Sequence, residues 1–333
     1  MGKADVNVNI WLSEKKRFAN LFNGVIYGGR QVILPEDLVE VNSVSSVSVK
    51  NRAGKTKNMK RYRDIIMKWR NQATLVLLAN ESQGKVHYAM PHKVMLYDGM
   101  DYETQIRNNW KNFNDRRKQN KKAGLPLEHL TAGEYLSRFR KKDRLIPIIS
   151  LVFYYGSEPW DGPVDLYDMF QLEGTKEEKE ILEKYLPNYK INLVDAERLK
   201  DVEKFSDDLQ VILTMLRYRD SKEELTDYIN ENKKFFQNVD YETSQAMKAF
   251  LNMKQIPGEA EHKEEMIDMC KAIQEMYDDG VKDGIQQGVE QGRTELLKEQ
   301  IQRKLKKEKT PTQIAEELEE SVEVIEKIIK EMQ

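Results

Sequence analysis

A mixed α/β fold is predicted for this chain by three features of its sequence. Residues 13–28 carry apolar side chains at helical spacing, which indicates an amphipathic helix. Residues 59–69 and 73–82 are predicted as two strands that a short turn joins into a hairpin. Residues 145–154 form an apolar run that is typical of a strand buried on both faces. This order of elements favours a mixed sheet flanked by helices.

The ends of the predicted helices carry residues that suit those positions. Ser13 can cap the first helix, and Gly28 can end it. Pro91 suits the first turn of a second helix, because the N–H that proline lacks would have no partner there. Residues 176–256 are predicted to be helical, with amphipathic stretches. We therefore expect a mostly helical C-terminal extension after the α/β core.

The 333 residues are predicted to form three parts. Residues 1–170 form the α/β core, and residues 171–258 form a helical extension packed on that core. Residues 259–333 form a charged helical tail. The boundary before the tail is placed at Pro257 and Gly258, because the chain beyond them is almost entirely helix-forming and highly charged.

Composition limits the classes of function and location. Charged residues make up 33% of the chain but the net charge is only −2, so any contact with nucleic acid depends on a local basic patch. The single cysteine, Cys270, excludes an internal disulfide and suits a reducing cytosol. No apolar stretch approaches the roughly 20 residues of a membrane span, and the N-terminus lacks a signal-peptide core. We expect a cytoplasmic protein without membrane contact.

Two acidic residues mark the two predicted strands. Asp64 lies on the first strand, and Glu81 follows seventeen residues later at the end of an apolar run. Glu81 and Gln83 would project from one face, because residues two apart on a strand point the same way. Two carboxylates at one place repel each other unless a cation lies between them, and hard oxygen ligands favour Mg²⁺ or Mn²⁺. The pattern alone also fits two surface acids beside a polar strand end.

Several segments, taken in order and spacing, resemble those of a known family. They are residues 18–23, 32–37, 61–69, 80–83, 87–91, 94–98, 151–156 and 159–163. In these segments the chain resembles the recombination-promoting nuclease / putative transposase family, a branch of the PD-(D/E)XK nuclease superfamily. The resemblance covers roughly residues 10–240 and implies a PD-(D/E)XK nuclease-like mixed sheet as the core.

The resemblance also implies a function and assigns roles to the acidic residues. It implies a divalent-metal-dependent DNA endonuclease associated with recombination or transposon-like elements. Asp64 and Glu81 would bind Mg²⁺, or Mn²⁺, beside the scissile phosphate. Gln83 stands where the superfamily usually has lysine, and a glutamine orients water only by hydrogen bonding because it carries no charge.

Two further residues receive roles from the same resemblance. Glu14, on the first helix, would add a carboxylate to the metal site. The alternative is an ordinary first-turn glutamate favoured by the helix dipole. Lys93 fills the basic position of a motif where arginine is expected and would face the phosphate, without the bidentate fork of arginine. The alternative for Lys93 is a solvated cation.

A basic segment over residues 107–122 is the candidate surface for DNA. Lysine and arginine contact phosphates, and the interleaved aromatic residues can stack on an unpaired base. The candidate residues are Arg107, Lys111, Arg116, Arg117 and Lys118. The alternative is a solvated helix and loop. The four histidines and Cys270 show no spacing typical of a zinc site.

Four glycines recur every fourth residue in the tail. They are Gly280, Gly284, Gly288 and Gly292. Each costs about 1 kcal/mol in a helix relative to alanine, so close approach of another helix is the expected compensation. We expect a homo-oligomer formed through residues 263–333, with a loose tether as the alternative. Residues 310–332 are predicted as a helical hairpin, whose acidic second helix favours protein contact over major-groove reading.

These observations give one preferred function and two rivals. The preferred function is hydrolysis of DNA phosphodiester bonds by a Mg²⁺-dependent endonuclease. The first rival is a catalytically inactive nuclease fold, impaired at Gln83, that binds DNA or acts as a scaffold and self-associates through its C-terminal helices. The second rival is an oligomerising interaction protein whose functional part is the tail.

Overall fold

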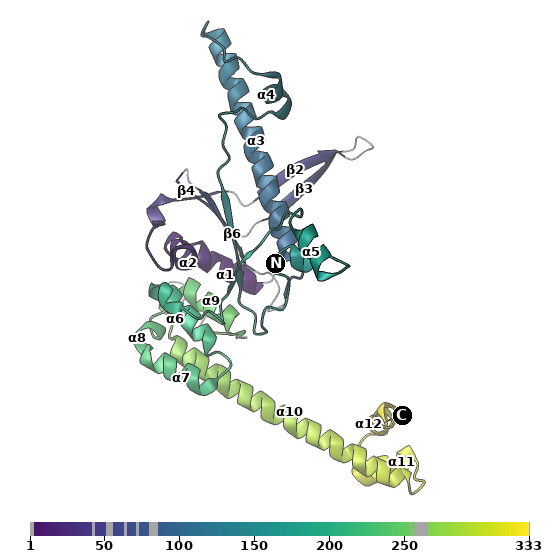
Figure 1. Ribbon diagram of the computed structural model, residues 1–333. Coiled ribbons are helices and arrows are strands. Elements are labelled where there is room, and N and C mark those ends of the chain that lie inside the picture. Colours follow the sequence, from purple (N-terminus) through teal and green to yellow (C-terminus); the bar gives the residue numbers. More distant parts are fainter. Residues whose placement is uncertain are drawn as a thin grey trace. The chain divides into compact units, whose positions relative to one another are not determined.

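The computed structural model describes residues 3–41, 44–50, 56–62, 65–70, 73–79, 86–253, 255–256 and 266–332. The chain divides into two compact units, Met1–Ile267 and Asp268–Gln333, and each is described by itself (Figure 1).

The first unit contains nine α-helices among its described residues. They are α1 (Lys3–Ser13), α2 (Lys15–Tyr27), α3 (Met90–Lys122), α4 (Ala132–Ser137), α5 (Lys176–Glu183), α6 (Asp207–Arg217), α7 (Lys222–Glu231), α8 (Lys233–Phe236) and α9 (Tyr241–Phe250). Three single-turn 3-10 helices are η1 (Pro35–Asp37), η2 (Tyr167–Met169) and η3 (Val202–Lys204). The described strands are β1 (Leu38–Glu40), β2 (Val44–Lys50), β3 (Thr56–Tyr62), β4 (Ile65–Trp69), β5 (Ala73–Ala79), β6 (Ile148–Tyr154) and β7 (Asn192–Asp195).

A five-stranded mixed sheet forms the centre of the first unit, with the strand order β1-β4-β5-β6-β7. β4 runs antiparallel to β1 and to β5, whereas β5, β6 and β7 run parallel to one another. Parallel neighbours need long crossover connections, and these contain α3 and α4 before β6 and α5 before β7. β2 and β3 form a separate antiparallel ribbon. The α/β class predicted from the sequence is therefore confirmed.

The helix α3 covers one face of this sheet. Ile66, Val76 and Val152 come from three neighbouring strands and pack with Val94 and Tyr97 of α3 in one buried cluster. Ile66 lies opposite Val76, and Val152 lies opposite Leu78, which is two residues beyond Val76 on β5. Because residues two apart on a strand point to the same side, Ile66, Val76 and Val152 share one face of the sheet. Burial of this face fixes the first turns of α3 on the sheet.

The helices α1 and α9 cover the other face. Phe153 follows Val152 on β6, and its ring centre lies 6.5 Å from that of Phe250 in α9. The ring of Trp11 in α1 lies 5.7 Å from the same phenylalanine, and its Nε1 donates a hydrogen bond of 3.0 Å to Thr243 Oγ1. The sheet is thus enclosed between two helical layers.

Two of the predicted boundaries at the N-terminus need correction. The helix predicted over residues 13–28 begins two residues later, as α2, and a second helix, α1, precedes it. Ser13 does not cap α2; it ends α1, and its hydroxyl donates to the carbonyl oxygen of Ile10 at 2.7 Å. Gly28 ends α2 as predicted, with a φ of 61° that suits glycine.

The strand predicted over residues 59–69 is wrong, because its two halves belong to different sheets. β3 pairs only with β2 in the ribbon, whereas β4 lies inside the five-stranded sheet. The sequence of β4 is apolar, and Ile65, Ile66 and Met67 are buried, which suits a sheet covered on both faces. The hairpin of β4 and β5 is confirmed as antiparallel.

The prediction that residues 176–256 are helical is wrong at one place. β7 interrupts it and extends the sheet by pairing with β6 in parallel. A strand of four residues carries little periodicity of its own, and its structure follows from the neighbouring strand. Pro91 in the first turn of α3 and the buried strand β6 agree with the sequence prediction.

The second unit contains α10 (Met269–Leu305), α11 (Pro311–Leu318) and α12 (Val322–Glu331). Its small core joins the end of α10 to the two short helices. The buried residues are Ile301, Ile314, Ala315, Ile325 and Ile328. A capping box at Thr310 and a hydroxyl cap at Ser321 start the two short helices. The predicted helical hairpin is therefore present.

Candidate functional site

The start of β4 and the end of β5 lie at the same edge of the sheet. Ile65, the first residue of β4, pairs in antiparallel register with Leu77, two residues before the end of β5. The predicted residues that adjoin these two strand ends in the sequence lie outside the described residues: Asp64, Glu81 and Gln83.

A turn after β6 lies against the chain that enters α3. The Tyr88 hydroxyl donates a hydrogen bond of 3.0 Å to Asp161 Oδ2, and this bond raises the pKa of Tyr88. Trp160 Nε1 donates to the carbonyl oxygen of Gly162 at 2.8 Å. A Cβ atom at Gly162 would lie 2.5 Å from Val86 Cγ1, so only glycine allows this approach. The turn therefore contacts Val86 and Tyr88, which lead into α3.

Lys93 lies near the start of α3. Its ammonium group is 5.9 Å from the ring centre of Tyr97, and no described residue forms an ion pair with it. One turn further on, Asp98 is 2% exposed and accepts hydrogen bonds from Ser150 Oγ at 2.8 Å and from the Tyr189 hydroxyl. Asp98 thereby ties α3 to β6 and fixes the position from which Lys93 projects.

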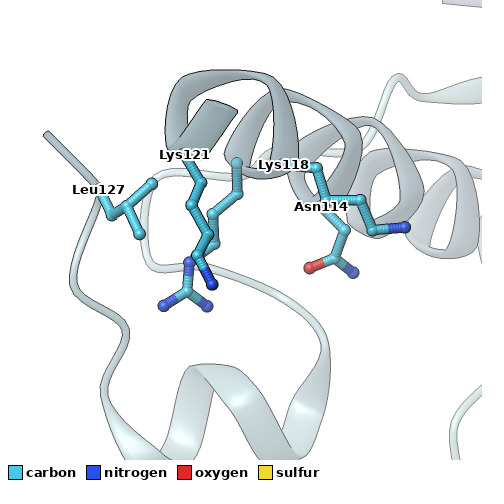
Figure 2. A pocket seen from close by; sticks show the side chains of 5 residues that line it. Asn114, Lys118, Lys121 and Leu127 are labelled. Atoms are coloured by element: carbon cyan, nitrogen blue, oxygen red, sulfur yellow. The ribbon is translucent and has the colours of Figure 1, made fainter. Parts of the chain in front are cut away.

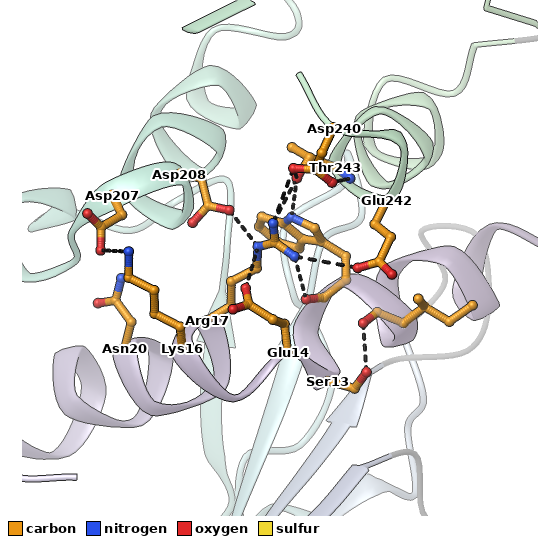
Figure 3. A network of polar contacts seen from close by, with 12 residues as sticks. Ser13, Glu14, Lys16, Arg17, Asn20, Asp207, Asp208, Asp240, Glu242 and Thr243 are labelled. Atoms are coloured by element: carbon orange, nitrogen blue, oxygen red, sulfur yellow. Dashed lines mark hydrogen bonds and ion pairs between the residues drawn. The ribbon is translucent and has the colours of Figure 1, made fainter. Parts of the chain in front are cut away.

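Glu14 is engaged by an arginine. Its Oε2 lies 3.3 Å from Arg17 Nε, and Figure 3 shows Arg17 at the centre of a polar network. The Arg17 side chain is 9% exposed and also meets Asp208 Oδ2 at 2.5 Å and Asp240 Oδ2 at 3.4 Å. It donates to Thr243 Oγ1 at 3.0 Å. Arg17 therefore joins α2 to α6 and α9, and the metal role of Glu14 stays a prediction.

The described residues give no metal cluster of their own. Among them, no group of three or more histidine, cysteine, aspartate or glutamate side chains is arranged to hold a metal ion. The predicted metal ligands Asp64 and Glu81 lie outside the described residues, so their role stays a prediction.

The second half of α3 and the segment after it form a basic arm, defined as residues 107–147. The arm carries twelve lysine and arginine residues against four aspartate and glutamate residues, in a chain whose net charge is −2. Figure 1 shows α4 alongside this half of α3. The arm is the kind of local positive surface that a near-neutral protein needs in order to bind nucleic acid.

An arginine holds the arm together. The Arg140 guanidinium lies 4.5 Å from the ring centre of Phe113, which is 6% exposed on α3. Its Nη2 lies 2.6 Å from Asp143 Oδ1 and its Nη1 lies 3.4 Å from Glu128 Oε2. The hydrogen bonds from Arg140 lower the pKa of Asp143. The segment after α3 is thus fastened back onto the helix.

The predicted DNA-binding residues differ in their pairing. Arg107 Nε lies 2.7 Å from Glu103 Oε1, and Lys118 Nζ lies 3.9 Å from Asp115 Oδ1. The remaining predicted residues have no ion-pair partner within the described chain: Lys111, Arg116 and Arg117. Their charges are therefore available to an anionic ligand.

A hollow of about 350 Å³ lies on this part of α3. Its lining is Asn114, Arg117, Lys118, Lys121 and Leu127 (Figure 2). The four residues of α3 are spaced at three and four positions, so they share one face of the helix. Arg116 falls two positions from Asn114 and lies on a different side. The structure thus brings together two of the five predicted cations.

The five residues named for DNA binding do not include Asn114, Lys121 and Leu127, although Asn114 and Lys121 lie inside the predicted basic segment 107–122. Their helical spacing is a signal for the first two, because it places them on the face of Arg117. No sequence pattern places Leu127 in the hollow, because Leu127 follows the end of α3 and helical spacing does not extend to it. No local sequence signal reveals the roles of Arg17 and Asp98. Arg17 and its partner Asp208 are 191 positions apart, and Asp98 and its partner Ser150 are 52 positions apart.

The comparisons with known proteins found a similarity over one part of the chain. Residues 131–247 match the family model described as "Putative transposase, YhgA-like". The matched segment runs from the arm into α9 and contains β6 and β7. No curated protein and no solved structure matches the chain. In the described part of the chain, no helix is long and apolar enough to cross a membrane.

Proposed function

We propose that this chain is a divalent-metal-dependent DNA endonuclease with a PD-(D/E)XK nuclease-like core, and the match of residues 131–247 to the model of YhgA-like putative transposases supports this proposal. The observation that carries the proposal is the antiparallel register of β4 and β5, which brings the start of one strand and the end of the other to one edge. Acidic residues adjoin both of these strand ends in the sequence.

The proposed chemistry is hydrolysis of a phosphodiester bond. Asp64 and Glu81 are the proposed metal ligands, because two carboxylates make a hard oxygen donor set that suits Mg²⁺ or Mn²⁺. When bound, the metal ion supplies positive charge at the scissile phosphate and a more acidic water molecule. Gln83 orients the attacking water by hydrogen bonding. Glu14 is proposed as a further ligand. In this role its carboxylate would leave Arg17 and bind the metal ion.

Lys93 contributes a second positive charge beside the phosphate. It projects from the first turns of α3, which follow the end of β5 in the chain, and no described carboxylate neutralises it. Lysine acts as a point charge, so it attracts the phosphate without fixing its orientation as an arginine would. The packing of Tyr97 and the hydrogen bonds of Asp98 support this position of Lys93.

The basic arm supplies the affinity for DNA. Phosphate contacts are independent of sequence, and they weaken as salt increases because bound counterions are released. The excess of eight positive charges in the arm supports this role, since the chain outside it is acidic. The arm and the strand ends belong to the same unit of the protein.

The test of cleavage is nicking of supercoiled plasmid in Mg²⁺, in Mn²⁺ and in chelator. We expect nicking that needs the metal and falls about 100-fold or more in Asp64→Ala and in Glu81→Ala, because each removes a group that stabilises charge in the transition state. Glu180→Ala, which removes an exposed carboxylate of α5, is the matched control and should cut as the unaltered protein does.

The second candidate function is DNA binding without cleavage. Two observations favour it: Gln83 stands in the lysine position, and the arm is built independently of the strand ends. Plasmid binding without nicking in either metal would support this function and contradict the endonuclease. Nicking that survives both alanine substitutions would place the chemistry elsewhere.

The helix α10 is proposed to mediate self-association of two chains. Val281, Ile285 and Val289 are 53%, 63% and 67% exposed, and they recur at the four-residue spacing of the glycines. An exposed apolar stripe of this kind is typical of a contact surface. Ile285→Glu should convert an associated form to monomer in sedimentation experiments, whereas the exposed Gln286→Glu should not. A monomeric unaltered protein would refute this part of the proposal.

A further inference from the structure

The hollow of the basic arm lies next to an exposed aromatic residue. Trp110 precedes Asn114 by four positions on α3, so the two share a helix face and are one turn apart. The ring centre of Tyr135, in α4, lies 6.1 Å from that of Trp110, and the planes meet at 72°. Tyr135 is 68% exposed, so most of its ring faces solvent. The open ring of Tyr135 therefore lies against Trp110, one helical turn from Asn114 at one end of the cationic hollow.

The lining of the hollow is suited to a phosphate group. Arg117, Lys118 and Lys121 supply three positive charges, and the lining contains no carboxylate. In the described chain, Arg117 and Lys121 have no ion pair, and Lys118 reaches its nearest carboxylate only at 3.9 Å. Figure 2 shows the Lys121 side chain extending away from α3, between Leu127 on one side of the view and Asn114 and Lys118 on the other. Asn114 adds an amide that can donate to a phosphate oxygen.

The residues around Tyr135 are held firmly in place. A capping box joins Thr131 and Glu134 at the start of α4, and the Glu134 carboxylate also accepts from the backbone N–H of Lys141 at 3.0 Å. Leu136, beside Tyr135, is 86% exposed. An aromatic and an aliphatic side chain are thus presented to solvent on a short helix whose ends are fixed. The exposed ring of Tyr135 is the group on this helix that can stack on a nucleic-acid base.

We propose that this surface binds single-stranded DNA, with a backbone phosphate in the hollow and an unpaired base stacked on Tyr135. The inference rests on the proposed contact of the arm with DNA, and it does not depend on cleavage. Single-strand binding surfaces combine a positive groove for the backbone with aromatic rings for the bases. In a duplex the base faces are covered by their neighbours, so Tyr135 would find only backbone.

The experiment compares two oligonucleotides of about 20 nucleotides, one single-stranded and one the duplex of the same sequence. Binding is measured by fluorescence anisotropy at several salt concentrations, with chelator present so that no cutting occurs. We expect the single strand to bind at least 5-fold more tightly than the duplex. Equal binding of the two, or tighter binding of the duplex, would overturn the proposal.

Variants separate the phosphate contact from the base contact. Tyr135→Ala should weaken single-strand binding about 5- to 100-fold, as loss of one stacking ring does, and change duplex binding less than 2-fold. Tyr135→Phe keeps the ring and should bind as the unaltered protein does, which separates stacking from a folding defect. Arg117→Ala with Lys121→Ala should lower the slope of log affinity against log salt by about 0.7 for each cation removed.

A control and the cleavage assay complete the test. Lys184→Ala removes an exposed cation outside the arm and should leave the salt slope unchanged. If Tyr135→Ala binds both oligonucleotides normally while the plasmid is still nicked, this inference fails and the endonuclease stands. If Tyr135→Ala loses the single strand and no plasmid is nicked, the inference stands and the endonuclease fails.

Discussion

The ion pair of Glu197 and Arg219 shows how single side chains secure the ends of β6 and β7. Each side chain is 9% exposed, and Arg219 Nη2 donates to Glu197 Oε2. Arg219 Nη1 also donates to the carbonyl oxygen of Tyr155 at 2.8 Å, directly after β6. Burial raises the pKa of Glu197, and the charge of Arg219 opposes this rise. The pair therefore depends on both partners being present.

Removal of one partner should cost more than removal of both charges. Arg219→Met leaves Glu197 with Arg198 as its remaining cation, whose Nη1 lies 3.3 Å from Glu197 Oε2. We therefore expect a loss of about 3 kcal/mol in the free energy of unfolding, at the low end of the range for a broken buried pair. Glu197→Gln combined with Arg219→Met should lose less, because no buried charge remains unpaired. Urea denaturation of the two single variants and the double variant measures this. Additive losses would mean that the two groups act independently.

Glu134 should make the arm sensitive to acid. Hydrogen bonds from the backbone N–H groups of Thr131 and Lys141 lower its pKa from 4.5 to about 2. A carboxyl group whose pKa is lower in the folded state stabilises that state above the unfolded pKa. This contribution should therefore be lost as pH falls from about 4.5 to about 2.

The amide resonance of Lys141 reports on this titration. We expect it to shift with an apparent pKa near 2, together with loss of the α4 cap, and to stay flat over the same range in Glu134→Gln. A midpoint at the ordinary value of 4.5 would show that the carboxylate does not hold this loop.

The sequence predicted residues of the candidate site only where they carried a local pattern. The spacing of charges along one helix was sufficient to name Arg117 and Lys118, and both line the hollow. Arg17 and Asp98 could not be found in this way, because their partners come from distant parts of the chain. A buried polar contact is set by the fold, and no local pattern encodes it.

The helix α3 is long enough to pack on the sheet at one end and to carry the basic hollow at the other. Its first turns are buried against the sheet through Met90 and Val94, whereas its last turns carry the charges of the hollow. A straight α-helix of 33 residues spans about 50 Å, so the two ends are far apart. The same helix therefore positions Lys93 at its start and presents the basic arm at its end.

The sequence predicted helices and strands correctly where a local signal was strong. The apolar run of β6 and the proline that starts α3 gave correct predictions. The strand over residues 59–69 was wrong because β-propensity does not show where one sheet ends and another begins. β7 was missed because its four residues are too few to show the alternation of apolar and polar side chains that marks a strand. Its strand structure follows from pairing with β6.

Substitution of the glycines of α10 tests whether this helix mediates self-association. No atom lies within 4 Å of a Cβ built on Gly284 or Gly288, so alanine fits at both positions within the chain itself. We expect Gly284→Ala and Gly288→Ala each to stabilise the helix by about 1 kcal/mol. Slower amide hydrogen exchange along α10 measures this gain.

The same substitutions should weaken association if another chain approaches the glycines closely. Sedimentation of the double alanine variant would then show more monomer than the unaltered protein, although its helix is more stable. Association that stays the same, or strengthens, would show that the glycines only loosen a tether.

The division into two units separates the residues of the proposed chemistry from those of the proposed assembly. The sheet, the arm and the Arg17 network all lie in Met1–Ile267. The second unit has a core of its own between the end of α10, α11 and α12. A unit with its own core can be removed without opening the other, provided that the cut falls outside buried positions.

Removal of residues 279–333 should therefore give a folded monomer that retains the DNA functions. The cut follows the buried positions Met269, Ala272 and Ile273, and it keeps the bridge in which Ile267 N–H donates to the Val239 carbonyl oxygen at 2.8 Å. We expect cooperative thermal unfolding, a monomer in sedimentation, and unchanged preference for single-stranded over duplex oligonucleotide. Metal-dependent nicking, if present in the full chain, should persist. A truncated chain that still associates would place the contact in the first unit, and one that folds but binds no DNA would place the tail in the DNA site.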